Sequence, residues 1–330
     1  MPTRTIAGVE VGAVGLGCMN LNHAYGAPPA PADAAALLRR AVELGVTYFD
    51  TAALYGFGTN EMLVGATLAP YRDRVYLASK CGATGVDGRR VIDGRPETLK
   101  RTCRESLARL DTEVIDLYYL HRWDKRVPVE DSVGALAELV AAGHVRAIGL
   151  SEVSAATLRR AHAVHPIVAV QSEYSLWTRN PEVAVLEECR RLGVAFVAFA
   201  PLGRGFLAGG VPDPAALLPR DIRRDMPRFA EPQFAVNARL LAPYRVLAAA
   251  AGCTPAQLAL GWLLHRAPHV IPIPGTTSSA HLKENVGAAA LRLEPELRAR
   301  LDALINPATV SGPRYNAATQ ADIDTEELPG

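Results

Sequence analysis

The stretch VTYFDTAALYG, residues 46–56, contains the structural unit from which most of this chain is built. A run of β-branched and aromatic residues ends in Asp50, and a short segment with a glycine follows it. Short runs of this kind are typical of buried strands, and the next residues have the length and composition of a helix. The stretch therefore predicts a strand, then a loop with polar side chains, then a helix.

The same unit recurs along the chain. We predict strands at residues 14–18, 46–50, 75–80, 115–121, 146–152, 167–173, 194–200 and 270–275. We predict helices at residues 31–44, 60–70, 96–110, 129–142, 154–164, 180–192, 237–266 and 278–290. Local signals support these boundaries, because Pro96 suits a first helical turn and Gly45, Gly143 and Gly193 suit helix ends.

Strands that alternate with helices indicate a parallel sheet covered by helices. Eight such units in 330 residues fit a closed (β/α)₈ TIM barrel, and we assign residues 1–330 to that single domain. An open doubly wound sheet is the alternative, but residues 15–20 (GLGCMN) lack the third glycine of its fingerprint. We expect residues 1–12 to form an N-terminal hairpin and residues 203–236 a long functional loop at the C-terminal mouth.

Composition narrows the classes of function. The formal charge of +1 gives no general attraction to nucleic acid or to an anionic membrane. The first residues lack the apolar stretch of a signal peptide, and the longest apolar run, residues 194–203, is too short to span a bilayer. Five cysteines without a CxxC motif are typical of a reducing compartment, so we expect a cytoplasmic protein. The sequence does not indicate an oligomeric state.

Several common motifs are absent or incomplete. The histidine pairs in HAVH (162–165) and HRAPH (265–269) lie beside prolines, and no cysteine or carboxylate pattern completes a ligand set. We therefore predict no metal site. The chain has no P-loop motif, and residues 149–152 lack the closing glycine of a serine-hydrolase elbow.

Polar residues end several of the predicted strands. In a barrel of this type the active site lies at the carboxyl ends of the strands, where these residues would converge. Taken singly, each also has a structural interpretation, such as a turn cap or a surface charge. Taken together with Tyr55, which follows the second strand, they indicate an active site: Asp50, Lys80, His121, Ser151, Glu152 and Gln171.

The chemistry of four of these residues suits proton transfer. A lysine at the inner end of a strand needs a counter-charge, because burying it alone is costly, and Asp50 can supply that charge to Lys80. A positive charge near Tyr55 favours the phenolate and is expected to lower the phenol pKa from about 10. Tyr55 would then act as a general acid toward a carbonyl oxygen, and His121 would hydrogen-bond the same oxygen.

The chain resembles the aldo-keto reductase family over nearly its whole length. The resemblance implies a (β/α)₈ barrel, a nicotinamide cofactor that is usually NADPH, and a catalytic tetrad of Asp50, Tyr55, Lys80 and His121. It implies that Tyr55 donates the proton, that Lys80 and Asp50 adjust the acidity of Tyr55, and that His121 orients the carbonyl. The matching stretches are GLGCMN (15–20), FDTAALYG (49–56), ASKCG (78–82), LYYLHR (117–122), GLSEVS (149–154), VQSEYSLWTR (170–179), FAPLGRGFL (199–207) and IPGTTSSAHLKEN (273–285).

The resemblance also implies a set of cofactor-binding residues. Ser151 and Gln171 match the groups that hold the nicotinamide carboxamide, and Phe199 matches an aromatic residue that stacks on the nicotinamide. Glu284 and Asn285 match the pair that reads adenine. The full set is Gly17, Met19, Asp50, Ser151, Glu152, Gln171, Phe199, Pro201, Leu202, Gly203, Arg204, Gly205, Gly275, Thr276, Thr277, His281, Glu284 and Asn285.

Some positions depart from the family pattern. Glu152 stands where many relatives have asparagine, so it can accept but not donate a hydrogen bond. His281 stands where many relatives have an arginine that grips the 2′-phosphate, and Gly275 where some have lysine. We therefore expect NADP(H) to be preferred less strongly, with NAD(H) as the alternative. We expect the 2′-phosphate to rely on backbone amides, Thr277, His281, and Arg204 or Lys283.

The predicted function is NADPH-dependent reduction of an aldehyde or ketone to an alcohol. We expect the 203–236 loop and four aromatic residues to line the pocket for a small-molecule carbonyl substrate, apolar or aromatic in character. Either tryptophan among them can equally pack under a loop. Two alternatives are a cofactor-binding regulatory or redox-sensing module of the same fold with slow turnover, and a barrel hydrolase with two carboxylates. The four aromatic residues are Tyr25, Phe57, Trp123 and Trp177.

Overall fold

The computed structural model describes residues 1–22, 24–209 and 213–328 of the chain. Its main sheet has eight parallel strands, and each lies within three residues of a predicted strand. In spatial order the strands are β3 (Leu16–Gly17), β4 (Tyr48–Asp50), β5 (Tyr76–Cys81), β8 (Ile115–Leu120), β9 (Val145–Ser151), β10 (Ile167–Glu173), β11 (Ala195–Phe199) and β12 (Val270–Pro272).

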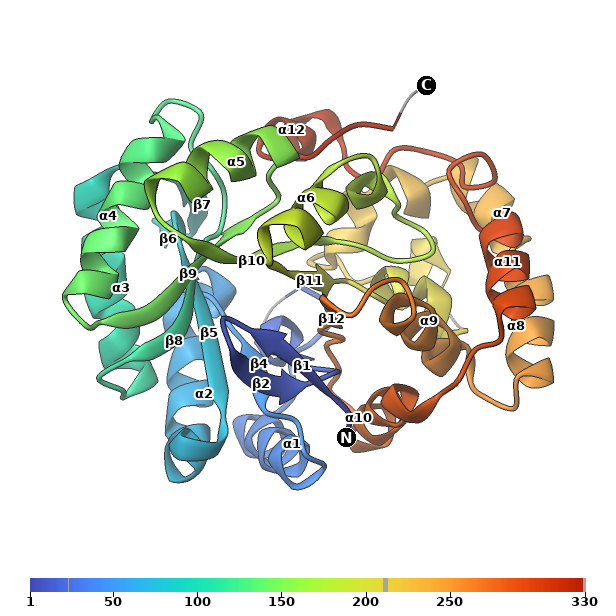
Figure 1. The fold of residues 1–330 in the computed structure, drawn as a ribbon. Coiled ribbons are helices and arrows are strands. Elements are labelled where there is room, and N and C mark those ends of the chain that lie inside the picture. Colours follow the sequence, from blue (N-terminus) through green and yellow to red (C-terminus); the bar gives the residue numbers. More distant parts are fainter. Residues whose placement is uncertain (23, 210–212, 329–330) are drawn as a thin grey trace.

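Helices follow the strands and cover the outside of the sheet (Figure 1). The predicted helix 237–266 is wrong as a single element, because the chain breaks at residues 251–254. There the Thr254 hydroxyl accepts from the Gln257 amide, and the Gln257 side chain completes a capping box that starts a new helix. The helices are α1 (Pro31–Glu43), α2 (Thr59–Leu68), α3 (Pro96–Leu110), α4 (Val129–Ala141), α5 (Ala155–Val164), α6 (Val185–Leu192), α7 (Gln233–Ala238), α8 (Leu241–Ala250), α9 (Pro255–Leu264), α10 (Ser279–Gly287), α11 (Pro295–Leu304) and α12 (Ala317–Ala321).

The first and last strands of the sheet meet and close the barrel. The Gly15 amide donates to the Pro272 carbonyl at 3.0 Å, and the Gly17 amide donates to the Pro274 carbonyl at 3.4 Å. The backbones approach so closely that a Cβ atom on Gly17 would lie 2.9 Å from the Ile273 carbonyl oxygen. Glycine at this position therefore permits the closure, and the predicted (β/α)₈ architecture is confirmed.

A hairpin blocks the amino end of the barrel. Its strands, β1 (Thr3–Ile6) and β2 (Val9–Gly12), pair antiparallel and lie across the sheet (Figure 1). Ile6 and Val11 are buried in the same apolar cluster as the inward-facing Tyr48 and Leu117. The predicted N-terminal hairpin is confirmed, and it leaves the carboxyl end of the barrel as the end where a site can form.

A second hairpin, which the sequence analysis missed, follows β5 at the carboxyl end. Its strands are β6 (Ala83–Val86) and β7 (Arg89–Ile92). The turn residues Asp87 and Gly88 have φ angles of 49° and 72°, and an Asp-Gly pair between short strands is a recognised hairpin signal. This hairpin brings Arg90 to the mouth of the barrel.

The C-terminal segment after α11 also returns to the carboxyl end, where α12 lies near α5 (Figure 1). Lys125 donates to the carbonyls of Ala321 and Ile323, at 2.9 and 2.7 Å. The Ser154 hydroxyl donates to the Asp324 carboxylate at 3.0 Å. These contacts fix the segment over residues that follow β8 and β9.

The predicted long loop, residues 203–236, contains short 3₁₀ turns and the start of α7; residues 210–212 lie outside the described part. Its Ile222 amide donates to the Ala24 carbonyl across the mouth at 3.0 Å. Within the described ranges, no individual helix has both the length and the apolar composition of a membrane span. One bent pair, residues 233–250 and 255–264, meets both measures when taken together.

Candidate active site

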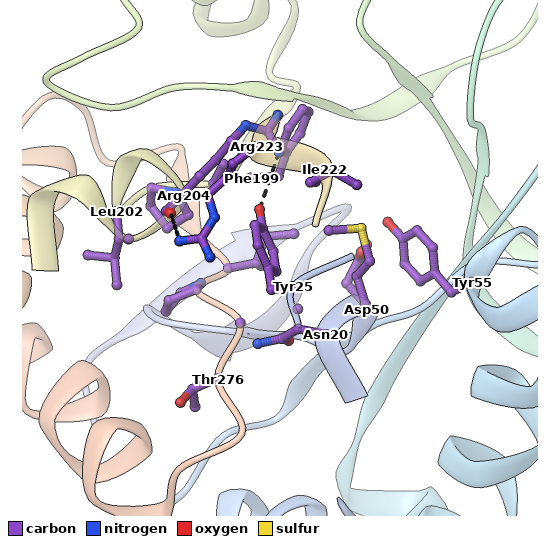
Figure 2. Close-up of a pocket in the computed structure, with 18 of the residues that line it drawn as sticks. Asn20, Tyr25, Asp50, Tyr55, Phe199, Leu202, Arg204, Ile222, Arg223 and Thr276 are labelled. Carbon is purple, nitrogen blue, oxygen red and sulfur yellow. Dashed lines mark hydrogen bonds between the residues drawn. The ribbon is translucent and has the colours of Figure 1, made fainter. Parts of the chain in front are cut away.

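A cavity of about 910 Å³ opens at the carboxyl end of the barrel. In Figure 2, Tyr55 and Asp50 lie on one side of it and Leu202 and Thr276 on the other, with Tyr25 and Arg204 between them. Of the predicted tetrad, Asp50, Tyr55 and His121 line the cavity, and Lys80 is buried behind them. The structure therefore brings the four residues together.

Lys80 is fully buried, and each of its ammonium protons has an acceptor. The Nζ atom donates to Asp50 Oδ1, to the Thr51 carbonyl at 2.8 Å and to the Tyr55 hydroxyl at 3.1 Å. Neighbouring strands β4 and β5 place the acid and the lysine side by side. The predicted ion pair is present, and it explains how a charged lysine is accommodated inside the barrel.

The loop after β4 directs Tyr55 inward. Three successive residues, Gly56, Phe57 and Gly58, have φ angles of 54°, 52° and 95°. This left-handed turn reverses the chain directly after Tyr55 and leads into α2. It also points Phe57 outward, where 54% of that residue is exposed.

Burial raises the pKa of Tyr55 above its ordinary value of 10, and the Lys80 ammonium opposes that shift without reversing it. The expectation of a lowered phenol pKa is therefore wrong for this state of the protein, because the loss of water outweighs the positive charge. Burial acts to lower the pKa of Lys80, but the Asp50 carboxylate and the Tyr55 hydroxyl together outweigh it, so the pKa is raised. At neutral pH Tyr55 is protonated and Lys80 is charged.

His121 packs edge-on against Tyr55, with ring centroids 5.9 Å apart. Burial, together with the positive charges of Arg122 and Lys80, holds the pKa of His121 well below 6.5. The imidazole is therefore neutral at pH 7. Its Nδ1 atom is buried and has no hydrogen-bond partner among the described residues.

The two residues matched to the carboxamide site line the cavity next to the tetrad. Gln171 Nε2 donates to Asp50 Oδ2 at 2.7 Å, and Ser151 Oγ accepts from Arg122 at 3.2 Å. Glu152 does not join them at the wall. Its carboxylate is buried against Arg314, at 2.5 Å, and accepts from the Glu173 amide at 2.9 Å.

Arg204 crosses the cavity and is held by several partners. It pairs with Glu173 at 2.6 Å and donates to the hydroxyls of Tyr25, at 3.2 Å, and Tyr315, at 3.0 Å (Figure 2). These contacts leave it poorly placed to grip a 2′-phosphate. Lys283 is exposed on α10 and does not line the cavity, whereas His281 does.

The remaining wall residues fit a dinucleotide. All the predicted cofactor residues line the cavity except Glu152 and Gly203. The buried Oδ1 atoms of Asn20 and Asn285 have no partner in the part of the chain that the structure describes. Thr276 and Thr277 precede the first turn of α10, where backbone amides and the helix dipole favour a phosphate.

The predicted substrate residues fit less well, since only Tyr25 lines the cavity. Phe57 is exposed and lies against Gly85 of the second hairpin. Trp123 lies off the wall and donates to the Val127 carbonyl at 2.8 Å. Trp177 is buried against Phe229, with ring centroids 5.6 Å apart, so it packs under the loop instead.

Several wall residues were not named individually in the sequence analysis. Ile222, Arg223 and Met226 belong to the 203–236 loop, which was expected to line the pocket. The others come from the second hairpin, the end of β8 and the C-terminal segment, and they are Arg90, Arg122 and Tyr315. The sequence held a signal for the first two of these, in the Asp-Gly turn and in the position next to His121, whereas no local pattern marks Tyr315.

Comparisons with known proteins agree with this geometry. A family model described as the aldo/keto reductase family matches residues 13–306. A glycerol dehydrogenase from Gluconobacter oxydans is 26% identical, with 94% of this chain and 97% of that chain covered, at a TM-score of 0.85. An aldo/keto reductase from Klebsiella pneumoniae in complex with NADP and acetate is 27% identical, with 95% and 98% covered, at a TM-score of 0.73.

A third solved structure, the holo form of an aldo-keto reductase from Bacillus halodurans, is 26% identical, with 93% of this chain and 97% of that chain covered, at a TM-score of 0.77. Fold and site together define a barrel oxidoreductase. The chain belongs to the aldo/keto reductase family.

Proposed function

We propose that this protein reduces an aldehyde or ketone to an alcohol, with NADPH as the hydride donor and Tyr55 as the proton donor. The contact that best supports this proposal is the Tyr55 hydroxyl, 3.1 Å from a buried lysine at the wall of the cavity. Two relatives from Klebsiella pneumoniae, solved with NADP and with NADPH, support the choice of cofactor. When bound, NADPH supplies the hydride that reduces the carbonyl carbon.

The protein's own residues then handle the proton and the oxygen. Tyr55 holds a proton at its hydroxyl and releases it to the carbonyl oxygen as negative charge develops there. Lys80, kept charged by Asp50, stabilises the phenolate that remains. The neutral His121 ring can donate an N–H to the same oxygen and so fix its position.

Binding of the cofactor is assigned by position along the cavity. Ser151 and Gln171 would hold the carboxamide beside the tetrad, and the ring of Phe199 would stack on the nicotinamide. Thr276 and Thr277 would hold the adenosine phosphate at the start of α10. The adenine would contact Glu284 and Asn285, both at the wall.

The direct test is Tyr55→Phe, measured as NADPH oxidation against a panel of aldehydes, ketones and sugars. We expect kcat to fall by about 10² to 10⁴, the usual contribution of a general acid, because phenylalanine has no proton to give. The dissociation constant for NADPH should change by less than about twofold, since the residue acts on the substrate.

Tyr71→Phe is the matched control, because Tyr71 packs against the core away from the cavity. Full activity in Tyr55→Phe would show that another group donates the proton. Tight NADPH binding by the wild type without turnover on any carbonyl would instead favour the redox-sensing alternative. Hydrolysis without cofactor would favour a hydrolase.

Cofactor preference can be tested at His281. We expect the wild type to bind NADPH more tightly than NADH, but by a modest factor. Among the described residues, Arg204 is held by Glu173 and Lys283 lies off the cavity wall, so neither is well placed for the 2′-phosphate. In His281→Arg, NADPH should bind about tenfold more tightly, through a charge-assisted hydrogen bond, with NADH unchanged. Tighter binding of NADH than NADPH by the wild type would contradict the proposed cofactor.

A further inference from the structure

Arg122 is a cation at the cavity wall that the proposed mechanism does not use. It follows His121 in the chain and lines the same cavity. Its Nη1 atom donates to the His121 carbonyl at 2.6 Å and to Ser151 Oγ at 3.2 Å. Its Nε atom is buried and has no hydrogen-bond partner within the described ranges. The guanidinium is thus held in place while part of its hydrogen-bonding capacity is unused.

The other arginines of the wall have carboxylate partners. Arg204 pairs with Glu173 at 2.6 Å, and Arg223 pairs with Asp221 at 2.7 Å. Arg122 forms no ion pair with any residue that the structure describes. An uncompensated charge at a partly buried wall is costly. A ligand that brings a negative charge would remove that cost.

Arg90 adds a second positive charge to the same wall. It reaches the cavity from β7 and pairs with Asp322 at 2.5 Å, but more than a third of each side chain is exposed, so the pair is weak. Burial lowers the pKa of Arg90, and the positive charge of Arg122 lowers it further. The two guanidinium groups therefore repel one another, and an anion between them would be stabilised by both.

We propose that the substrate carries an anionic group, a carboxylate or a phosphate monoester, as well as its reacting carbonyl, and that Arg122 binds this group with help from Arg90. Guanidinium groups suit both anions, because their paired N–H donors match two oxygens at once. The inference rests on the proposed reductase function and narrows its substrate class. It replaces the expectation of an apolar or aromatic carbonyl, which depended on four aromatic residues of which only Tyr25 lines the cavity.

The first experiment compares matched aldehydes with NADPH as the reductant. One set shares an aromatic frame: 4-carboxybenzaldehyde, 4-formylphenyl phosphate and the neutral methyl 4-formylbenzoate. The other set pairs succinic semialdehyde with butanal. We expect kcat/KM to be at least about tenfold higher for an anionic member than for its neutral partner, the gain typical of one charge-assisted hydrogen bond. Comparing kcat/KM for 4-carboxybenzaldehyde and 4-formylphenyl phosphate shows which anion is preferred.

The outcomes separate the two proposals. If none of these aldehydes and no carbonyl of the wider panel is reduced, the reductase function itself is wrong. If neutral aldehydes are reduced as efficiently as anionic ones, the reductase function stands and the inference about the anion is wrong.

The second experiment uses Arg122→Met, which keeps the bulk of the side chain and removes its charge. For the preferred anionic aldehyde kcat/KM should fall by about 10- to 100-fold, mainly through KM, while the neutral aldehyde should change by less than about threefold. Arg122→Lys should recover part of the loss. Arg126→Met is the matched control, since Arg126 is on the same loop but is mostly exposed and away from the cavity.

Binding of NADPH provides the last discriminating measurement. Its dissociation constant should stay within about twofold of the wild-type value in Arg122→Met, because the phosphates are assigned to other elements. The proposal would be overturned if Arg122→Met lost NADPH affinity tenfold or more and lost kcat/KM equally for anionic and neutral aldehydes. That result would mean that Arg122 binds the cofactor and not the substrate.

Discussion

Lys80, Tyr55 and His121 are all buried, yet only Lys80 carries a charge at neutral pH. The reason is that Lys80 has the Asp50 carboxylate beside it, whereas neither ring has an opposite charge that outweighs the loss of water. Desolvation therefore favours the uncharged forms of the phenol and the imidazole. Both rings keep an N–H or O–H proton that can be directed at a carbonyl oxygen.

The lowered pKa of His121 predicts a specific pH dependence of stability. Unfolded His121 binds a proton as the pH falls through about 6.5, while the folded protein resists that proton. Acidification below 6.5 should therefore favour unfolding, by up to about 1.4 kcal/mol per pH unit from this one group. The measurement is urea unfolding at pH 7.5, 6.5 and 5.5. Between pH 7.5 and 5.5 the free energy of unfolding should decrease less in His121→Asn than in the wild type.

Tyr55→Phe serves as the reference in that experiment, because neither side chain at position 55 titrates in this range. Its stability should run parallel to that of the wild type from pH 7.5 to 5.5. A His121→Asn curve that is also parallel to the wild type would mean that folded His121 takes up its proton normally.

Single residues differ in how well they could be predicted from sequence. Asp50, Lys80 and His121 end strands, and the strand pattern alone places them at one mouth. Trp177 lies in a loop, and its neighbours in sequence do not show whether it faces the cavity or Phe229. The pKa of Tyr55 depends on how completely its surroundings exclude water, which only the packed structure reveals.

Among the elements, α2, α3 and β5 are joined by a buried acid. Glu61 of α2 is fully buried and accepts from Ser79 of β5 at 2.5 Å. Its other oxygen pairs with Arg109 of α3 at 2.6 Å. One carboxylate thereby ties two helices to the strand that carries Lys80.

Removing the arginine from this group should destabilise the protein strongly. In Arg109→Met the Glu61 carboxylate stays buried without its cation, so we expect the free energy of unfolding to fall by about 3 kcal/mol. Arg101→Met is the control, because Arg101 is on the same helix and its side chain is 61% exposed. Urea unfolding of both variants is the measurement, and a loss below about 1 kcal/mol in Arg109→Met would contradict the prediction.

Elements were predictable where the signal is local. Gly45, Gly143 and Gly193 correctly marked the ends of helices, since all three have positive φ angles. The capping residue Thr254 and the Asp87-Gly88 turn were equally local signals, but the sequence analysis did not use them. The length of α9 and the second hairpin could thus have been inferred from turn chemistry alone.

At the scale of the whole molecule, the C-terminal segment is tied to the barrel through buried charges. Arg314 pairs with Glu152 at 2.5 Å, and the side chains are only 6% and 0% exposed. Tyr315 donates to Glu173 at 3.4 Å. Glu173 ends β10 and Glu152 directly follows β9, so the segment covers the mouth beside the cavity.

Arg314→Met should loosen this segment and lower the stability of the protein. We expect a loss of about 3 kcal/mol in the free energy of unfolding, because Glu152 would remain buried without its partner. Limited proteolysis should then cut the segment after residue 312 sooner than in the wild type. Arg292→Met, at an exposed position, is the control, and equal cleavage of both variants would contradict this role for Arg314.

The overall barrel was predictable because each strand-helix unit has its own local sequence pattern. The contacts of the C-terminal segment were not, since Arg314 and Glu152 are 162 residues apart and no local pattern links them. The same holds for the arginines at the mouth, which come from a hairpin, a strand end and a loop. Their shared position results from the closed fold.

The barrel closes through the hydrogen bond between Gly15 and Pro272, and this contact determines when folding can finish during synthesis. Its two partners lie roughly 260 residues apart in the chain. At a synthesis rate of about 5–20 residues per second, the first strand waits on the order of 10 to 50 s before the last one exists. During that interval the nascent chain exposes an unfinished edge, and Gly17 and Gly275 cannot yet face each other across one wall. A ribosome-bound chain should therefore acquire its ligand only near the end of translation.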